Sequence, residues 1–563
     1  MKNNTSSTLV MSSFLTLRCG APDVATSGLI SSIPTTELVF VISIFVFFLQ
    51  TQSKRSSKTK SSSLPLPPGP AVSWPIIGNI PDLFHKKPAF RWIDKLMKDM
   101  NTDILSVRLG NVHIIPVTSP EIAREFLKKQ DATFATRPIT MGTEYSSRGF
   151  LSVAVAPLGD QWKKMRRVVA SELMSPSRLR WLLDKRSEEA DNLVRYIYNQ
   201  CIDNSTTNYV GGVVNIRTVS RMYSGNVIRK LMFNMRYFGI GRKDGGPGVE
   251  EEEYVQALFN VLSLLYAFSV ADFMPIIRWL DLDGHEKLMK KASKIVNSYH
   301  DPVIDERIKQ WRSADGDRFI NKKQPHDLLD VLICLKDANG NPLLSTEEIK
   351  AQSADLIYAS VDNPSNAVEW ALAEMINQPE MLQKAAEEID RVVGKDRLVQ
   401  ESDFPRLNYV KSCAREAFRL HPIAPFNLPH VAISDAVVAG YFIPKGSQVL
   451  LSRPGLGRNA KVWDEPLKFK PERHLDGSGE QVGAGENDLS FFSFSTGRRG
   501  CMGVPLGTSM TVMLLARLLQ GFSWSAPPGE SIGLSESCHD LFLAKPLCAL
   551  AKPRLPMHLY PTV

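Results

Sequence analysis

The chain has few cysteines, and their arrangement is typical of neither a zinc site nor a disulfide framework. Seven cysteines are spread over 563 residues, and no Cys-x-x-Cys pair occurs. The odd number and wide spacing argue against disulfides, and the lack of close pairs argues against zinc. A cysteine of this kind is usually a small buried apolar residue. The seven are Cys19, Cys201, Cys334, Cys413, Cys501, Cys538 and Cys548.

Nucleotide-binding motifs are missing as well. The sequence has no GxGxxG after a strand, no P-loop and no flavin signature. An enzyme of this sequence that uses NADPH must therefore receive its electrons from a partner protein. The net charge is only +8, and no nucleic-acid motif or basic low-complexity tract occurs. This mild charge suits an anionic membrane or an acidic protein rather than nucleic acid.

One cysteine differs from the other six by its neighbours. Cys501 lies in the segment 494–503, which also holds three glycines and two arginines. Glycines allow a tight turn and close approach to a flat partner. Backbone N–H groups and nearby arginines favour the thiolate over the thiol. A thiolate held in this way can ligate a haem iron and promote O–O cleavage.

The spacing Phe494-x-x-Gly497-x-Arg499-x-Cys501-x-Gly503 resembles the haem-ligand signature of the cytochrome P450 family. Other segments resemble further motifs of that family, in the family's order. Trp162 and Arg166 resemble its C-helix motif. The Glu-x-x-Arg of residues 416–419 and the Pro-Glu-Arg of residues 471–473 resemble two more. Each of these alone could be an ordinary core residue or surface helix pair.

The resemblance implies a role for each matching residue. Cys501 would ligate the iron of haem b, and Phe494 would lie beside the haem. Trp162, Arg166, His430 and Arg499 would face the haem propionates. Glu416, Arg419 and Arg473 would form a buried structural network. A lone histidine such as His430 is more often a satisfied or solvated side chain.

The resemblance also implies a mainly α fold with small β-sheets and a single catalytic domain, predicted for residues 71–563. Residues 88–97 form an amphipathic pattern, and residues 103–117 predict a hairpin that turns near Gly110. Long helical patterns dominate from Trp162 to Ile376. Residues 239–248 and 312–324 predict loops. Residues 437–451 and 542–558 predict small strand-rich regions.

The N-terminal region predicts a membrane anchor. Residues 38–49 are almost purely apolar, and a basic cluster follows at residues 54–60. By the positive-inside rule, this order places the downstream domain in the cytosol. The alternative is a cleaved signal sequence, because a full membrane span needs about 20 residues.

We therefore expect a single-pass protein of the endoplasmic reticulum membrane, in contact with lipid. Its lumenal tail would be residues 1–28, its anchor residues 29–50, and its basic and proline-rich hinge residues 51–70. Asn3 and Asn4 begin glycosylation sequons.

The segment 359–370 departs from the usual pattern of the family. Most family members carry Ala-Gly-x-Asp-Thr in this helix, but here Ser360 replaces the glycine and Asn363 the threonine. Asp362 and Asn363 are the candidate catalytic residues. Asparagine cannot relay a proton as a hydroxyl does. Pro364 lacks an N–H and is expected to produce a bulge beside the oxygen site.

This departure resembles the plant amino-acid N-monooxygenases, a subgroup that forms aldoximes. Residues 425–430 and 495–501 match the same subgroup, and residues 135–150 are most like its phenylalanine-using members. L-Phenylalanine is thus the expected substrate, with tyrosine, tryptophan, valine and isoleucine as alternatives. Arg148 and Asn427 are candidates to bind the substrate carboxylate. The other candidate substrate contacts are Thr143, Ala359, Phe426 and Phe542.

Two other functions stay open at this stage. The first is a carbon hydroxylase acting on a terpenoid or phenolic. The second is a non-catalytic, membrane-tethered haem binder, which the unusual Asn363 slightly favours. The expected partners are an NADPH–cytochrome reductase, O2 and the amino acid. Lys163, Lys164, Arg167 and Arg498 are expected on the face that receives the reductase.

Overall fold

The computed structural model describes residues 64–202, 211–265, 267–312, 324–479, 489–491 and 493–561. By its internal contacts, the chain divides into Met1–Ser63 and Leu64–Val563. The predicted lumenal tail, the anchor and most of the hinge lie outside the described residues. The described part of the hinge, residues 64–70, contains neither helix nor strand, in keeping with its four prolines.

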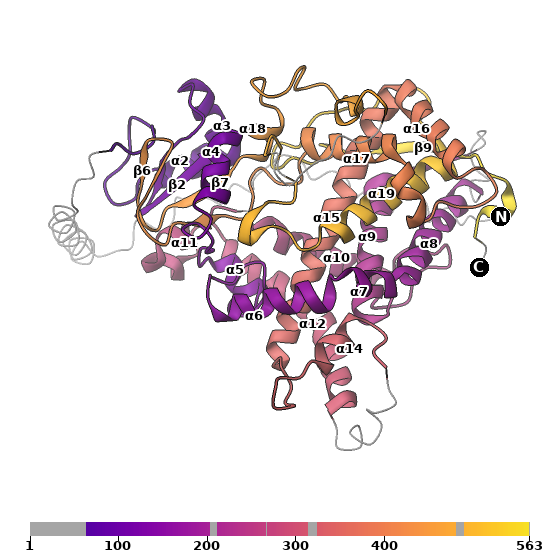
Figure 1. The fold of residues 1–563 in the computed structure, drawn as a ribbon, viewed down its shortest axis with the longest axis horizontal. Coiled ribbons are helices and arrows are strands. Elements are labelled where there is room, and N and C mark those ends of the chain that lie inside the picture. Colours follow the sequence, from indigo (N-terminus) through magenta and orange to yellow (C-terminus); the bar gives the residue numbers. More distant parts are fainter. Residues whose placement is uncertain are drawn as a thin grey trace, which may run out of the picture. The chain divides into compact units, whose positions relative to one another are not determined.

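Helices dominate the described residues (Figure 1), as the sequence predicts. The helix α15 (Thr346–Asn377) passes through the middle and contacts seven other helices, namely α5, α9, α12, α14, α16, α17 and α19. The longer helices are α8 (Leu183–Ile202), α9 (Ile216–Phe233), α10 (Val249–Leu265), α12 (His285–Arg312), α15 (Thr346–Asn377), α16 (Pro379–Val392), α17 (Asn408–Leu420) and α19 (Val504–Gly521). The shorter ones are α2 (Ile80–His85), α3 (Ala89–Asp99), α4 (Pro120–Arg124), α5 (Met141–Ser146), α6 (Asp160–Val168), α7 (Pro176–Trp181), α11 (Val270–Phe273), α14 (Leu328–Cys334) and α18 (Arg453–Gly457).

Three small sheets accompany the helices in the described residues. The first has the order β1-β2-β7-β4, the second β3-β9-β8, and the third pairs β5 with β6. Their strands are β1 (Val107–Leu109), β2 (Val112–Val117), β3 (Gly212–Asn215), β4 (His430–Val431), β5 (Ala436–Val438), β6 (Tyr441–Ile443), β7 (Gln448–Leu451), β8 (Phe522–Ser525) and β9 (Cys548–Pro553).

The predicted hairpin is confirmed, since β1 and β2 are antiparallel and Leu109 pairs with Val112. Gly110, at the turn, has a φ of +56°. The predicted strand region 437–451 is divided between two sheets, because β7 pairs in parallel with β2 while β5 pairs only with β6. The strand β3 interrupts the region predicted as helical, and it forms by pairing with the distant β9.

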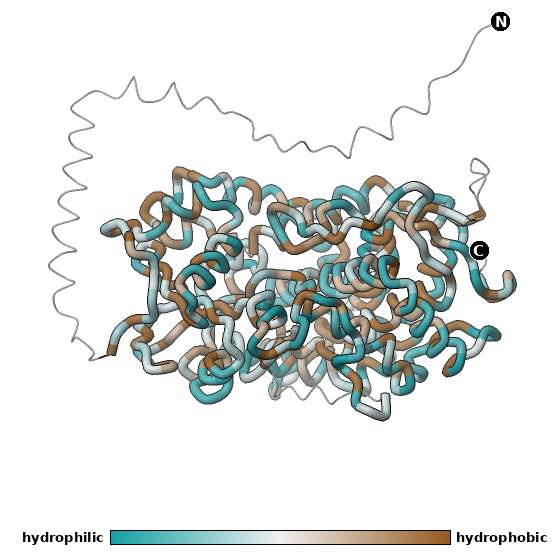
Figure 2. Tube along the Cα trace, turned by 90° about the horizontal axis from the view of Figure 1, so that it is seen from above, coloured by the Kyte–Doolittle hydropathy of each residue, from teal (hydrophilic) through white to brown (hydrophobic). Residues whose placement is uncertain are grey.

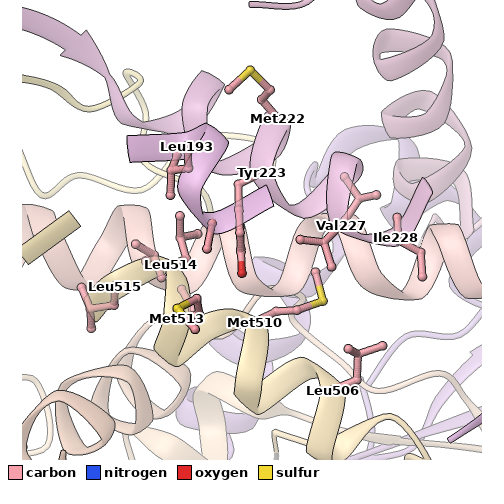
Figure 3. Close-up of a cluster of buried hydrophobic side chains, with 14 of the residues drawn as sticks. Leu193, Met222, Tyr223, Val227, Ile228, Leu506, Met510, Met513, Leu514 and Leu515 are labelled. Atoms are coloured by element: carbon pink, nitrogen blue, oxygen red, sulfur yellow. The ribbon is translucent and has the colours of Figure 1, made fainter. Parts of the chain in front are cut away.

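Apolar and polar residues alternate along the trace (Figure 2), as expected for amphipathic helices. The apolar faces meet in a core that spans most of the helices. In Figure 3, Tyr223 and Val227 of α9 lie near Met510 and Met513 of α19. The core thus fixes α9 and α19 in position next to α15.

One segment of the described residues, Val249–Phe273, is apolar and long enough to cross a membrane. Its helix α10, however, contacts α12, and Tyr254, Leu258 and Val261 of α10 are completely buried. This is the pattern of a core helix in a globular domain.

Candidate active site

The Cys501 segment forms a turn that leads into α19. A short 3₁₀ turn covers Gly497–Arg499, and the Cys501 N–H donates to the carbonyl of Phe494 at 2.9 Å. Gly497 has a φ of +71°, and a Cβ at this position would lie 2.4 Å from the Leu127 carbonyl oxygen. Only glycine fits this backbone without displacement.

The thiol of Cys501 is partly accessible, although protein surrounds most of it. Burial raises the pKa of Cys501, while the Gly503 N–H and the charges of Arg166 and Arg453 oppose that shift. A positive ion at the sulfur would favour the thiolate further. The Phe494 ring packs edge-on against Phe418, with centroids 5.7 Å apart. The turn therefore presents one sulfur in a fixed place, as a metal ligand requires.

Buried and half-buried cationic side chains gather on the segments around this turn. Arg499 is 6% exposed, and its Nε and Nη2 donate to the carbonyls of Ala135 (2.6 Å) and Ala156 (2.7 Å). Its guanidinium lies 4.5 Å from the ring centroid of Trp162. Arg166, one turn after Trp162 on α6, donates to the Gly500 carbonyl at 2.7 Å. The C-helix motif and the cysteine turn are therefore in direct contact.

His430 adds an unpartnered nitrogen to this cluster. Its Nδ1 lies 2.8 Å from the Phe134 carbonyl and donates to it, whereas its buried Nε2 has no hydrogen-bond partner. Burial, with Arg137 and Arg499 nearby, holds the pKa of His430 well below its ordinary value. Burial also lowers the pKa of Arg499 to about 9, with Arg137 and Arg166 adding to the shift. An anion at this place would relieve both unfavourable interactions, and the two carboxylates of a haem fit it.

Arg137 belongs to the same cluster and was not predicted as a haem contact. It is 9% exposed, and its Nη1 donates to the carbonyls of Leu428 (2.7 Å) and Pro429 (2.9 Å). These bonds join it to the segment that ends in His430. The available signal was its place within 135–150, the segment that resembles the phenylalanine-using members of the subgroup.

Glu416, Arg419 and Arg473 form a buried network, in the arrangement that the resemblance implies. Arg419 donates to both carboxylate oxygens of Glu416 at 2.8 and 2.7 Å, and Arg473 donates at 3.0 Å. His474 lies 2.8 Å from the same carboxylate. Glu416 and Arg419 have no exposed surface. These donors lower the pKa of Glu416 to about 2, although burial opposes the shift.

The helix α15 carries Asp362 and Asn363 past the site. Asp362 is buried, and its Oδ1 has no partner. Burial raises the pKa of Asp362 from 3.8 to about 7. The Asn363 Nδ2 donates to the Ala359 carbonyl of its own helix at 3.1 Å. Ala359 is exposed, although it lies in the middle of α15 between buried residues.

The bulge expected at Pro364 does not form. The helix α15 continues as an α-helix through Pro364 as far as Asn377. Side chains bond the backbone around the proline, since the hydroxyls of Ser360 and Ser365 donate to carbonyls one turn earlier. These bonds and the packing on seven neighbouring helices keep the helix regular.

Comparison with known proteins identifies the family. The sequence pattern described as Cytochrome P450 matches residues 67–550. The chain belongs to the cytochrome P450 family. A zebrafish cytochrome P450, whose structure was solved with progesterone, shares its fold with a TM-score of 0.67. That structure is 23% identical and covers 83% of this chain and all of its own.

Two plant enzymes are far more similar. A tryptophan N-monooxygenase of Prunus mume is 58% identical over 530 residues, which cover 94% of this chain and 97% of that protein. A phenylalanine N-monooxygenase of Arabidopsis thaliana is 58% identical over 535 residues, covering 94% and 99%. This P450 is therefore an enzyme, an oxidoreductase of the haem-dependent kind. The equal identity to two proteins named for different amino acids does not single out a substrate.

The predicted substrate residues of this P450 do not all lie together. A cavity of about 60 Å³ is lined by Thr143, Phe426 and Asn427. The Asn427 Oδ1 accepts from the Leu451 N–H at 2.7 Å, whereas its buried Nδ2 has no partner and remains a donor. The Thr143 hydroxyl donates to the Thr140 carbonyl at the start of α5. Ala359 and Phe542 are not among the residues that line this cavity.

Arg148, predicted to bind a substrate carboxylate, is already paired with two carboxylates of the chain itself. Its guanidinium forms ion pairs with Asp301 at 2.6 Å and Glu347 at 2.9 Å. These two carboxylates, one on α12 and one on α15, neutralise its charge. The sequence could not show this, because Asp301 and Glu347 are more than 150 residues away from Arg148.

Proposed function

We propose that this P450 is a haem-thiolate N-monooxygenase that converts an L-amino acid to its (E)-aldoxime. The observation that supports this most strongly is its similarity, along almost the whole chain, to enzymes named amino-acid N-monooxygenases. L-Phenylalanine is the first substrate to test, because residues 135–150 are most like phenylalanine-using members. Two N-hydroxylations, each consuming O2 and NADPH, are followed by loss of CO2 and water.

Some residues of the chain would bind the cofactor, and others would contact the substrate. Bound haem, ligated by Cys501, would supply the activated oxygen. Trp162, Arg166, His430 and Arg499 would hold its propionates, and Phe494 would contribute an apolar contact beside it. Asp362 and Asn363 would control the supply of protons. Among the substrate contacts, Phe426 offers an apolar ring, and Asn427 offers an N–H donor.

The remaining parts of the proposal concern electrons and location. We assign NADPH to a partner reductase, received on the basic face that includes Lys163 and Arg167. The apolar residues 38–49, with the basic cluster behind them, support a single-pass anchor in the endoplasmic reticulum, with the catalytic domain in the cytosol. The domain limits proposed from the sequence, with catalysis in residues 71–563, remain part of this proposal.

A panel of amino acids tests the function directly. The full-length enzyme in membranes, with reductase and NADPH, is offered phenylalanine, tyrosine, tryptophan, valine and isoleucine. We expect an aldoxime from at least one, most rapidly from phenylalanine. Release of CO2 without aldoxime, or products only from terpenoid or phenolic substrates, would refute the proposal.

A further inference from the structure

The helices α9 and α15 place two arginines opposite two carboxylates, but only one of the two pairs is bonded. The Arg217 Nε donates to both carboxylate oxygens of Glu369, at 3.0 and 2.8 Å. One turn further along α9 lies Arg221, and two turns earlier on α15 lies Asp362. These two residues interact electrostatically but form no direct ion pair.

The guanidinium of Arg221 has an unusual environment for a cation. Among the described residues it forms no hydrogen bond and no ion pair. Its carbon lies 3.7 Å from the ring centroid of Phe259 on α10 and 5.6 Å from that of Phe542. Burial lowers the pKa of Arg221, and Asp362 is the main opposing influence. A largely buried guanidinium without a bonded anion is costly, so an anion that reached Arg221 would be stabilised there.

In the described part of the chain, Asp362 is a buried carboxylate that lacks a bonded cation, as Arg221 is a cation that lacks a bonded anion. Asp362 is 9% exposed, and its Oδ1 has no hydrogen-bond partner. Burial raises its pKa, with Arg221 opposing the shift and Asp540 adding to it. A donor bearing positive charge would satisfy this carboxylate. Arg221 and Asp362 thus influence each other electrostatically, yet neither has a bonded partner of opposite charge among the described residues.

We propose that Arg221 and Asp362 together bind the zwitterionic backbone of an α-amino acid, Arg221 its carboxylate and Asp362 its ammonium group. This inference rests on the proposed function and names the residues that recognise its substrate class. A planar guanidinium can bind a carboxylate through two parallel hydrogen bonds. The site recognises what all amino acids share, and the side chain is selected elsewhere. Asn427, which is neutral, then contributes to the cavity without carrying the carboxylate charge.

L-Phenylalanine and two analogues, each of which lacks one of its two charges, test this assignment. The analogues are 2-phenylethylamine (which lacks the carboxylate) and 3-phenylpropanoate (which lacks the amine). Affinities are measured by isothermal titration calorimetry on the full-length holoenzyme in detergent. We expect Arg221→Gln to weaken L-phenylalanine and 3-phenylpropanoate about tenfold to a hundredfold, as for loss of a charged hydrogen-bond pair. Binding of 2-phenylethylamine should change less than threefold.

Asp362→Asn should give the crossed pattern, weakening the two amines and sparing 3-phenylpropanoate. Arg221→Lys keeps the charge and should lose less affinity than Arg221→Gln. It also provides the test if the glutamine variant does not fold. Arg180→Gln, which removes an exposed arginine on α7, is the control. It should leave the ratio of affinities among the three ligands unchanged.

The outcomes separate the two proposals. If Arg221→Gln weakens all three ligands equally or none, the inference is wrong. It is also wrong if Asn427→Ala, rather than Arg221→Gln, removes the preference for ligands that carry a carboxylate. An enzyme that shows the crossed pattern but forms no aldoxime would overturn the proposed function alone. An enzyme that makes aldoxime without the crossed pattern would overturn this inference alone.

Discussion

At the scale of single residues, the environment of Cys501 is set by backbone geometry and charge. The turn from Phe494 fixes its position, and the Gly503 N–H with Arg166 favours the thiolate. Burial acts in the opposite direction. The sulfur would therefore become a strong ligand if an iron ion supplied positive charge, because metal binding and the ionisation of a thiol are coupled.

Replacing Cys501 by serine tests this ligand. We expect Cys501→Ser to fold but to lose the long-wavelength absorption band of the reduced protein under CO, because a serine oxygen does not replace thiolate donation. The measurement is the reduced-CO difference spectrum, with far-UV circular dichroism to check the fold. Persistence of the band in the serine variant would contradict the assignment.

The shifted pKa of Asp362 predicts how the stability of the protein changes with pH. The folded pKa of Asp362, about 7, lies above the ordinary 3.8. The folded state therefore keeps a proton that the unfolded state loses, and stability falls as pH rises between these values. Asp362→Asn carries no such charge. We expect it to be more stable than the wild type at pH 8, with the difference shrinking as pH falls toward 4.

Urea denaturation of both proteins without substrate, at pH 8, 6 and 4.5, measures this. The Asn427→Ala variant is a suitable comparison, because its change removes no titrating group. A stability difference between Asp362→Asn and wild type that stays constant over this range would show that Asp362 is ionised throughout.

At the scale of elements, α15 shows how a helix tolerates an internal proline. Pro364 leaves no N–H for the Ser360 carbonyl, yet the helix continues without a break. Hydroxyl groups of Ser360 and Ser365 bond nearby carbonyls, and neighbouring helices hold the rest. The tertiary packing therefore offsets a local cost that an isolated helix would not sustain.

Pro364→Ala should stabilise the fold. Proline in a helix interior is about 3 kcal/mol less favourable than alanine, and the restriction that proline places on the unfolded chain offsets part of this. We expect a gain of about 1–3 kcal/mol in the free energy of unfolding, measured by urea denaturation followed by circular dichroism. Ser365→Ala, which removes a hydroxyl bond but adds no N–H, should give no gain. A loss of stability in Pro364→Ala would mean that the proline ring itself packs favourably.

At the scale of the whole molecule, the chain consists of Met1–Ser63 and a much larger unit that begins at Leu64. The Cys501 turn, its cationic cluster and the Glu416 network all lie in the larger unit. Its core and its sheets are formed within that unit. The larger unit therefore contains all of the residues assigned to the haem site.

Deleting residues 1–63 should move the enzyme from the membrane to the soluble fraction and leave the reduced-CO band intact. The reason is that the apolar run 38–49 is removed while the haem site is unchanged. Ultracentrifugation of cell extracts, followed by spectroscopy of both fractions, measures this. Val41→Asp in the full-length chain should weaken membrane insertion by about 2.5–3.5 kcal/mol. Recovery of the deleted form entirely in the membrane fraction would show that another surface binds lipid.

The sequence pattern was sufficient to predict those features that depend on neighbouring residues along the chain. The glycines and arginines around Cys501, the Glu-x-x-Arg of Glu416 and the hairpin at Gly110 are local arrangements, so spacing and residue type predict them. The order of these motifs along the chain predicted the mainly α fold and the family, which the comparison confirms. The continuous α15 through Pro364 was missed, because its neighbours come from other parts of the sequence.

Tertiary structure alone decided which charges are paired. Arg148 was predicted to bind a substrate carboxylate, but in the fold its guanidinium forms ion pairs with Asp301 and Glu347. Arg221 belongs to none of the motifs recognised in the sequence. In the fold it lies near Asp362, and among the described residues it forms no hydrogen bond and no ion pair. Whether a buried charge is satisfied depends on groups that folding brings from distant segments. The sequence by itself therefore determined the family and the haem-dependent type of its chemistry, and the fold decided which buried charges are paired and which are not.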